Sequence, residues 1–478
     1  MKRTPLLAFL FLLQLKDIAA GITVPQTPPS GAVTVDQSLL SVSIEFFTLP
    51  GYTQIQATSN CLENLAELRG APPAIRIGGT TQDRATYNPN LASAVNYTVA
   101  TPADAPASLT YGPSFFTLAG QLKGDVTVGL NRQLNNQAAS LAAAVQAKKT
   151  MGNLFAFELG NEPEFYASNS AIIPKGQSWN QDTDAASQKS WFTTFSSSVG
   201  DMFQGAVYLS WSAGGLLSRI GTDGERFLKS ISRHSYPQSA CGGASTNLPN
   251  LMSHSGIVSY TKQYKSEAAS THAAGLRYFL GETNSATCGG GGISPTFGAA
   301  LWIVDYSLQA ALNGVDRLYF HQGTIGNCAY CFWGTSSVFA PYFGAAFVSE
   351  FFGTEPNTRL AMLDDGTSAL ATYALYSSSS NTLLRLLIVN SNYFSGSGAR
   401  PVSTVAFTQS VVRNGNVTAK RMTAASATAV SGVTIGGAAA FTSTCARTGT
   451  PALESVRVDG NGAFSVSLLA SEALIVFE

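Results

Sequence analysis

Charged side chains are scarce in this chain: only 12% of the 478 residues are Asp, Glu, Lys or Arg, and their formal charges cancel at pH 7. A protein that binds nucleic acid or an anionic membrane surface needs clustered positive charge, and the sequence contains no such cluster. We therefore expect neither partner. Apolar residues reach 45%, which argues against a disordered chain and allows a large core.

Long apolar runs are missing after the first twenty residues, so we expect no membrane span and no lipid-anchored tail. Residues 1–20 have a basic start, a short apolar stretch, LLAFLFLLQL, and small residues at the end, which is typical of a secretory signal peptide. The mature protein is thus expected to be secreted. Sequons at Asn96 and Asn416 suit glycosylation on that route.

Cysteine and histidine are also few, with six and four residues. An even number of cysteines in an exported chain favours disulfides, although the pairing cannot be read from the sequence. Cys328 and Cys331 have CxxC spacing but lack the second pair of ligands of a zinc site. Cys288 is better explained by a disulfide that holds its loop than by a catalytic thiol. We expect a monomer without metal or organic cofactor.

Eight short segments rich in β-branched and aromatic residues recur along the first two thirds of the chain, with helical stretches between them. Alternating strands and helices indicate a parallel sheet, and eight repeats predict a (β/α)₈ TIM barrel over residues 41–340. An open doubly wound sheet is the alternative, but the nearest glycine turn, RIGGTTQD, lacks GxGxxG spacing. The predicted strands are 41–47, 74–79, 125–130, 154–160, 206–211, 231–236, 277–282 and 317–322.

The composition changes near residue 340. Residues 341–478 are rich in Ser, Thr, Gly and Val and contain short alternating segments such as TLLRLLIVN. This pattern predicts a C-terminal antiparallel β-sandwich domain. Residues 21–40 precede the barrel and are a candidate for lending it a strand.

Two glutamates directly follow predicted strands. FELGNEPE, residues 157–164, ends the fourth strand with Glu162, and RYFLGETN, residues 277–284, ends the seventh with Glu282. Functional side chains of a barrel lie at the carboxyl ends of its strands, so we expect the two carboxyl groups to meet across the mouth. One protonated and one ionised carboxyl are what glycoside hydrolysis requires. Pro163 restricts the backbone of Glu162 to an extended or turned conformation.

The motifs GNEPEF and FLGETNS, with RIGGTTQD upstream, resemble those of the clan A retaining glycosidases, most closely the family 79 β-glucuronidases, which include heparanase. The resemblance covers nearly the whole mature chain and implies a barrel followed by a β-sandwich. It also implies that Glu162 is the acid/base, that Glu282 is the nucleophile, and that Asn161 binds the sugar 2-hydroxyl.

Four more strand-end residues are candidates for substrate binding. By the same resemblance, Arg76 and Tyr236 hold the nucleophile ionised and oriented. Glu45 is a candidate for bonding sugar hydroxyls, and His321 for lining the pocket. Each has a structural alternative: Arg76 as the partner of a structural acid, Tyr236 as a core residue, and the other two as packing residues.

The stretch after Glu282 reads SATCGGGG and lacks the tyrosine that helps hold the uronate in members of the family. The glycine run from Gly289 and Gly290 to Gly292 is a candidate for supplying backbone N–H groups instead, although such runs are commonly flexible loops. Tyr330 or Trp333, after the eighth strand, is a candidate for the missing contact.

These features predict a secreted retaining exo-β-glucuronidase that removes terminal glucuronic or 4-O-methylglucuronic acid from polysaccharide or proteoglycan glycans. One alternative is another clan A β-glycosidase, such as a β-glucosidase or β-galactosidase. A heparanase-like endo-enzyme is a second, but it needs clustered Lys and Arg for sulfate groups. A third is a non-catalytic carbohydrate-binding wall protein, which is expected to have lost a catalytic carboxylate.

Overall fold

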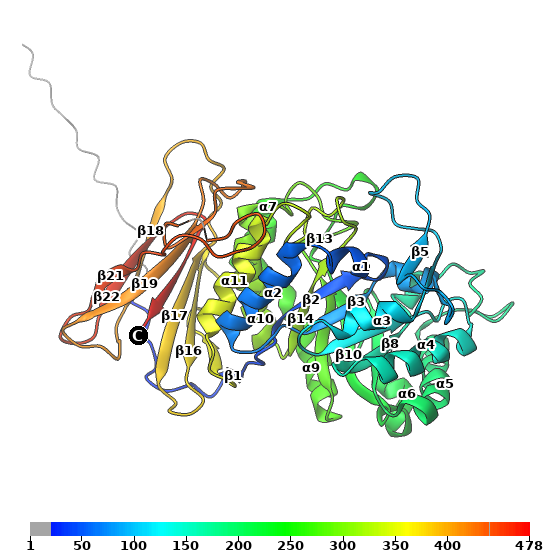
Figure 1. Ribbon diagram of the computed structural model, residues 1–478. Helices are drawn as coiled ribbons and strands as arrows, with labels where there is room; N and C mark the ends of the chain where they lie inside the picture. Colours follow the sequence, from blue (N-terminus) through cyan, green and yellow to red (C-terminus); the bar gives the residue numbers. More distant parts are fainter. Residues whose placement is uncertain (1–20, 439) are drawn as a thin grey trace, which may run out of the picture.

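The structure is a computed structural model that describes residues 21–438 and 440–478 (Figure 1). The predicted signal peptide, residues 1–20, lies outside the described residues. No helix in the described part of the chain is both long and apolar enough to cross a membrane.

Eight parallel strands close a barrel in the first part of the chain. They follow one another around it in chain order, and the last strand pairs with the first. Each strand segment predicted from the sequence overlaps one of them, so the predicted (β/α)₈ fold is confirmed. The strands are β2 (Leu40–Glu45), β3 (Ile75–Gly78), β7 (Val126–Leu130), β8 (Leu154–Leu159), β9 (Phe203–Tyr208), β10 (Leu228–Ser235), β12 (Arg277–Thr283) and β14 (Arg317–Gln322).

Helices surround the barrel, and α10 and α11 lie on the side that faces the C-terminal sheets (Figure 1). Helix α10 is almost entirely buried because it packs against both parts of the protein, which explains why most of its residues are apolar. The long helices are α2 (Gln56–Arg69), α3 (Pro113–Gly120), α4 (Gln137–Thr150), α5 (Gln181–Val199), α6 (Gly215–Glu225), α8 (His254–Thr261), α9 (Tyr264–Ala273), α10 (Phe297–Leu312) and α11 (Ala340–Phe352); α1 (Leu49–Tyr52) and α7 (Leu248–Met252) are short.

Two antiparallel sheets form the C-terminal domain and share a second apolar core, to which Leu386 and Leu474 contribute from one sheet and Val405 and Phe464 from the other. The predicted β-sandwich is thus confirmed. The larger sheet contains β1 (Val33–Thr34), β15 (Arg359–Met362), β16 (Leu370–Tyr376), β17 (Leu383–Asn390), β23 (Glu472–Phe477), β19 (Asn416–Thr423) and β20 (Thr434–Ile435), with β21 (Glu454–Arg457) paired to β19. The smaller sheet contains β18 (Val402–Phe407) and β22 (Phe464–Leu469).

Two details differ from the sequence prediction. Residues 340–352, where the β-rich domain was expected to begin, form α11, which contacts α10 and α2; the first strand after it, β15, begins at Arg359. The N-terminal segment does not join the barrel: Val33 and Thr34 pair with β15, and Ile22 bridges to Phe407. A strand added to the closed barrel finds no free edge there, whereas the sandwich offers one.

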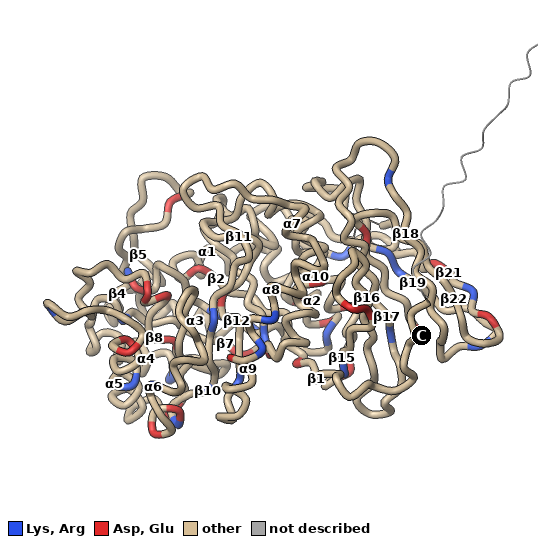
Figure 2. Tube along the Cα trace, turned by 180° about the vertical axis from the view of Figure 1, so that it is seen from behind, with Lys and Arg blue, Asp and Glu red and all other residues tan. Residues whose placement is uncertain are grey.

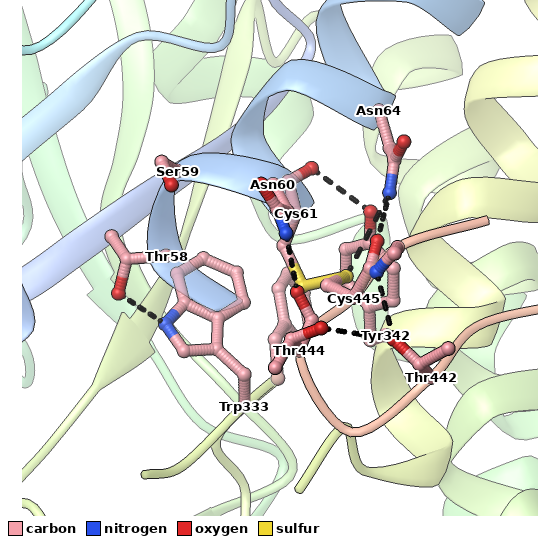
Figure 3. Close-up of a disulfide and its surroundings, with 12 residues drawn as sticks. Thr58, Ser59, Asn60, Cys61, Asn64, Trp333, Tyr342, Thr442, Thr444 and Cys445 are labelled. Atoms are coloured by element: carbon pink, nitrogen blue, oxygen red, sulfur yellow. Dashed lines mark hydrogen bonds between the residues drawn. A yellow bond between two sulfur atoms is a disulfide. The ribbon is translucent and has the colours of Figure 1, made fainter. Parts of the chain in front are cut away.

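Three disulfides connect all six cysteines, as the even count predicted. Cys61 of α2 is joined to Cys445, so one bridge links the barrel to the C-terminal domain (Figure 3). Beside it, the side-chain amide of Asn64 donates to the Cys445 carbonyl at 2.6 Å, and the Tyr342 hydroxyl donates to the Cys61 carbonyl at 2.9 Å. Side chains of both domains thus surround this bridge.

A second contact between the domains is a buried charged cluster. His254 of α8 lies between two carboxylates, with Nδ1 2.8 Å from Asp305 of α10 and Nε2 2.9 Å from Asp364 of the C-terminal domain. The Tyr373 hydroxyl of β16 donates to Asp305 from the other side. Burial alone lowers the pKa of His254, but the two carboxylates outweigh it and raise the pKa to about 10. The imidazole is therefore charged at neutral pH.

We expect His254→Gln to lower the free energy of unfolding by about 3 to 5 kcal/mol at pH 6, because it leaves buried carboxylates without a cation. Since the pKa is raised in the folded state, this stabilisation is complete below the unfolded pKa near 6.5 and is lost as the pH rises through about 10. Urea denaturation at pH 6 and pH 10 measures it. His272→Gln, which removes a half-exposed partner of Asp316, is the control and should cost less than about 1 kcal/mol. An equal effect of His254→Gln at both pH values would contradict a charged His254.

Candidate active site

A cavity of about 990 Å³ opens at the carboxyl ends of the barrel strands, where barrel proteins hold their functional side chains. Arg76, Asn161 and Gly290, which the sequence also suggested, are not among its lining residues. Seven of the candidates from the sequence line it: Glu45, Glu162, Tyr236, Glu282, Gly289, His321 and Tyr330.

Glu162 and Glu282 approach each other across the mouth of the barrel. A carboxylate oxygen of each and a ring nitrogen of His234 all lie within 4.8 Å of one another. Glu162 adopts a left-handed backbone, with φ 46° and ψ 58°, and its N–H donates to the Val207 carbonyl at 3.0 Å. This is the turned alternative for the residue before Pro163, in a region that costs a non-glycine residue energy and that clusters at functional sites.

The carboxylate of Glu282 receives two strong hydrogen bonds. Arg76 donates from Nη1 to Oε2 at 2.6 Å, and the Tyr236 hydroxyl donates to Oε1 at 2.7 Å. Burial raises the pKa of Glu282, but electrostatic interactions with His321, His234 and Arg76, together with the tyrosine hydrogen bond, outweigh it and hold the pKa well below its ordinary value. Glu282 is therefore ionised at neutral pH.

Arg76 combines both interpretations that the sequence left open. Its guanidinium is fully buried and pairs with Glu158 of β8 at 2.5 Å, which makes it the partner of a structural acid. The same group contacts Glu282 and donates from Nη2 to the Asn161 side-chain oxygen at 2.7 Å. One arginine thus positions side chains from β8 and β12 relative to each other.

Asn161 is held by two contacts. Its side-chain oxygen accepts from Arg76, and its backbone N–H donates to Asp83 at 2.7 Å. Among the described residues, none accepts a hydrogen bond from its Nδ2. Asp83 also accepts from the Tyr166 hydroxyl at 2.7 Å. Asp83 lies in RIGGTTQD but was not recognised from the sequence as a positioning residue.

Glu45 and His321 form a second polar group in the cavity wall. The imidazole Nε2 lies 3.3 Å from Glu45, and Nδ1 lies 2.9 Å from the Ser43 hydroxyl. Burial lowers the pKa of His321, but the charges of Glu282 and Glu45 raise it above its ordinary value. Glu45 also accepts from the Thr81 hydroxyl at 2.5 Å. Together they present a carboxyl group and an imidazole to a ligand.

Gly79 shows why the glycines of RIGG are needed. Its φ is +110°, and a Cβ at this position would lie 2.3 Å from Oε2 of Glu45. A side chain there would displace the carboxylate from the cavity wall.

The glycine run after Glu282 is only partly at the cavity. Gly289 lines it, but the N–H groups of Gly290 and Gly291 donate to the Thr287 carbonyl and the Ser294 hydroxyl, both at 3.2 Å. These two amides are therefore not free to form the row of donors suggested by the sequence. The Cys241–Cys288 disulfide holds the run, as expected for Cys288.

The loop after β14 brings Tyr330 to the cavity. Its ring centre lies 6.2 Å from that of Tyr236 and 6.0 Å from that of His321. Trp333, the alternative, is fully buried, and its indole N–H donates to Thr58 at 2.9 Å. Tyr330 is therefore the aromatic residue of this loop that can reach a ligand.

Two cavity residues were missed from the sequence. His234 is buried and places Nδ1 2.9 Å from Glu162; it lies two positions before Tyr236, and residues so spaced on a strand share a face, which was the available signal. Arg84 lines the cavity and forms no ion pair with any residue that the structure describes. It comes directly after RIGGTTQD and ends the 3-10 helix η2 (Thr80–Arg84), which follows β3.

The spacing of Glu162, His234 and Glu282 also allows a shared cation. Metal binding requires neutral imidazole and freely accessible carboxylates. The guanidinium of Arg76, 2.6 Å from Glu282, already neutralises one of these ligands. The electrostatics of the cluster fit a pair of reacting carboxyl groups better than a metal centre.

Comparisons with known proteins agree with the site. The family described as "Glycosyl hydrolase family 79 C-terminal beta domain" matches residues 372–475. A β-glucuronidase of Aspergillus niger is 30% identical over 464 residues, covering 85% of this chain and 83% of its own. A β-glucuronidase of Neurospora crassa is 29% identical, with 82% and 78% covered.

Solved structures were compared with this chain as well. A 4-O-α-L-rhamnosyl-β-D-glucuronidase from Fusarium oxysporum is 42% identical, with a TM-score of 0.91 over 96% of this chain and all of its own. An α-L-arabinofuranosidase from Thermotoga maritima, at 11% identity and a TM-score of 0.60 over 96% of both chains, supports the fold alone. The β-glucuronidase relatives show that this chain is a glycoside hydrolase, which overturns the alternative of a non-catalytic wall protein. The substrate is therefore a carbohydrate. The chain belongs to glycoside hydrolase family 79.

Proposed function

We propose that this protein is a retaining exo-β-glucuronidase. The observation that carries the proposal is the approach of Glu162 and Glu282, since one carboxylate oxygen of each lies within 4.8 Å of the other. Retaining glycosidases need carboxyl groups about 5 to 5.5 Å apart, whereas inverting enzymes leave about 6.5 to 9.5 Å for a water molecule. The short spacing here supports the retaining mechanism.

In the first step, the ionised Glu282 attacks the anomeric carbon while Glu162 donates its proton to the departing oxygen. A covalent glycosyl-enzyme results. In the second step, Glu162 takes a proton from water, which displaces Glu282 and restores the original anomeric configuration. His234, hydrogen-bonded to Glu162, orients the carboxyl group for both transfers, and Asn161 donates to the sugar 2-hydroxyl.

The specificity for a uronate rests on the β-glucuronidase relatives and on the donors in the cavity. Tyr330 and the backbone at Gly289 supply neutral donors on the side of β12 and β14. Arg84 adds a positive charge to the wall without a carboxylate partner among the described residues. A buried carboxylate needs such partners, since leaving it unpaired costs several kcal/mol.

Two loops support exo action. The side-chain amide of Asn327, in the loop after β14, donates to the Ala103 carbonyl, in the connection between β3 and β7, at 3.0 Å. Both residues line the cavity. A contact between these loops obstructs a cleft that an internal chain segment would have to cross. Elsewhere, charged residues are spread in short stretches over both domains (Figure 2), unlike the basic track that a sulfated polymer needs.

A second candidate is release of a 4-O-substituted glucuronyl unit. The Fusarium oxysporum relative acts on 4-O-rhamnosyl-glucuronide. The cavity, at about 990 Å³, lies at the upper end of the usual range of about 300 to 1,000 Å³ for ligand sites and accommodates more than one sugar ring. The disulfides support secretion as well, because they form in oxidising compartments.

A panel of aryl β-glycosides tests the specificity. We expect kcat/KM for the β-glucuronide to exceed that for the β-glucoside by about 100-fold or more, because the glucoside leaves the uronate donors without an ionic partner. Glucuronides that carry 4-O-methyl or 4-O-rhamnosyl groups decide between the two candidates. The first-formed sugar anomer, read by NMR, should be β. Faster cleavage of a β-glucoside or β-galactoside would leave only a clan A hydrolase.

A further inference from the structure

Phe165 is an exposed aromatic residue inside the cavity. Phe165 is 59% exposed and lines the cavity. It lies three positions after Glu162 in the chain. Leu209, which follows β9, lies in the same wall. Large apolar side chains that remain exposed within a binding cavity mark a surface that a ligand covers.

The backbone that carries Phe165 is fixed. It ends the 3-10 turn η3 (Pro163–Phe165), and its N–H donates to the Glu162 carbonyl at 3.0 Å. The Trp179 indole donates to the Pro163 carbonyl at 2.8 Å. The exposure of Phe165 is therefore a property of a rigid turn, which presents the ring at little entropic cost to binding.

Glu164 ties this turn to the loop after β9. One of its carboxylate oxygens accepts the N–H groups of Leu209 and Ser210, at 2.6 and 2.7 Å. Phe165 and Leu209, from two different strand-end loops, are thereby held in one wall. Glu164 acts on this wall through its neighbours, as a positioning residue.

The wall lies on the leaving-group side of the bond that is cleaved. The acid/base must reach the departing oxygen, so the residues next to Glu162 face the aglycone. Glu282 attacks from the opposite face of the anomeric carbon, and its partner Tyr236 lies with it. The position of Phe165, beside the proton donor, therefore assigns it to the aglycone.

We propose that Phe165 and Leu209 form a platform that binds the aglycone sugar. The platform contacts the apolar face of the pyranose ring, which is made of its C–H groups. The ligand class is a neutral hexopyranose that carries the β-linked glucuronyl group. This inference rests on the proposed function of the cavity. An aromatic ring offers a large rigid apolar surface of the right kind for such a face.

The test compares two substrates of wild type and Phe165→Ala. One is a disaccharide of glucuronic acid β-linked to galactose, and the other is β-glucuronyl fluoride, whose leaving group needs no proton and occupies no sugar site. We expect kcat/KM to fall about tenfold on the disaccharide and to stay within about twofold on the fluoride. Phe165→Tyr keeps the ring and should stay near wild type on both.

Tyr393→Ala is the matched control, because it removes an exposed aromatic residue, 40% exposed, from the C-terminal domain. It should leave both substrates unaffected. Turnover of the fluoride also reports whether Phe165→Ala is folded. An equal change on both substrates, or no change on either, would overturn the platform. If wild type cleaves neither glucuronyl substrate, the proposed function itself fails.

Discussion

Alanine in place of Glu282 is expected to lower kcat by at least about 10⁴-fold on glucuronides of every aglycone, the fluoride included. The attacking carboxylate of the first step is removed, so activation of the leaving group does not compensate. Steady-state kinetics on the fluoride, an aryl glucuronide and a disaccharide measure the loss. Glu63→Ala, which removes a surface partner of Lys123, is the matched control and should leave activity unchanged.

Azide should partly restore Glu282→Ala. Removal of the carboxylate leaves the Arg76 guanidinium and the Tyr236 hydroxyl facing a space that held an anion, and a small anion is attracted to it. Azide then attacks from the face that Glu282 occupied, so the product is the inverted, α-configured glucuronyl azide. A β-configured azide from this variant would contradict the assignment of Glu282 as nucleophile.

The barrel and its two glutamates could be predicted because their signals are local. Strands β8 and β12 are buried segments that change abruptly to polar residues, and parallel strands bring their carboxyl ends to one rim. The number of residues between Glu162 and Glu282 in the chain therefore does not affect whether they lie at the same rim. The resemblance of GNEPEF and FLGETNS to family motifs then supplied the roles, which composition alone does not contain.

The contacts that tune the site were harder to predict, because they join residues far apart in the chain. Arg76 meets Glu158 after 82 positions and Glu282 after 206. The sequence identified Arg76 as a candidate but not the second carboxylate that holds it. His234 carried a usable signal, since it shares the strand face of Tyr236.

Composition predicted the structure least well where the same residue types suit two different structures. The apolar run of α11 lies between two domains and carries no polar face to mark it as a helix. Gly290 is a second example, in a loop. A glycine indicates that the chain can turn at that position, but it does not indicate whether its backbone N–H is free to bind a ligand. The use of that N–H by Thr287 depends on the folded loop.

Glu162→Ala should lose activity in proportion to how much proton the leaving group needs. On the disaccharide we expect kcat/KM to fall about 10² to 10⁴-fold, the usual contribution of a general acid, because a sugar alkoxide is a poor leaving group. On β-glucuronyl fluoride the first step needs no proton and kcat/KM should change little. Its kcat should still fall, because Glu162 is also the base of the second step.

Rapid-mixing measurements of fluoride release separate these two steps. For Glu162→Ala we expect a burst equal to the enzyme concentration, followed by slow turnover, because the glucuronyl-enzyme on Glu282 accumulates without its base. Azide needs no deprotonation and should remove the slow phase, giving a β-configured azide since Glu282 is displaced from the opposite face. His234→Ala retains Glu162 and serves as the control, with a smaller loss on both substrates. Equal losses on the fluoride and the disaccharide, or an α-configured azide, would show that Glu162 and Glu282 do not divide the two roles in this way.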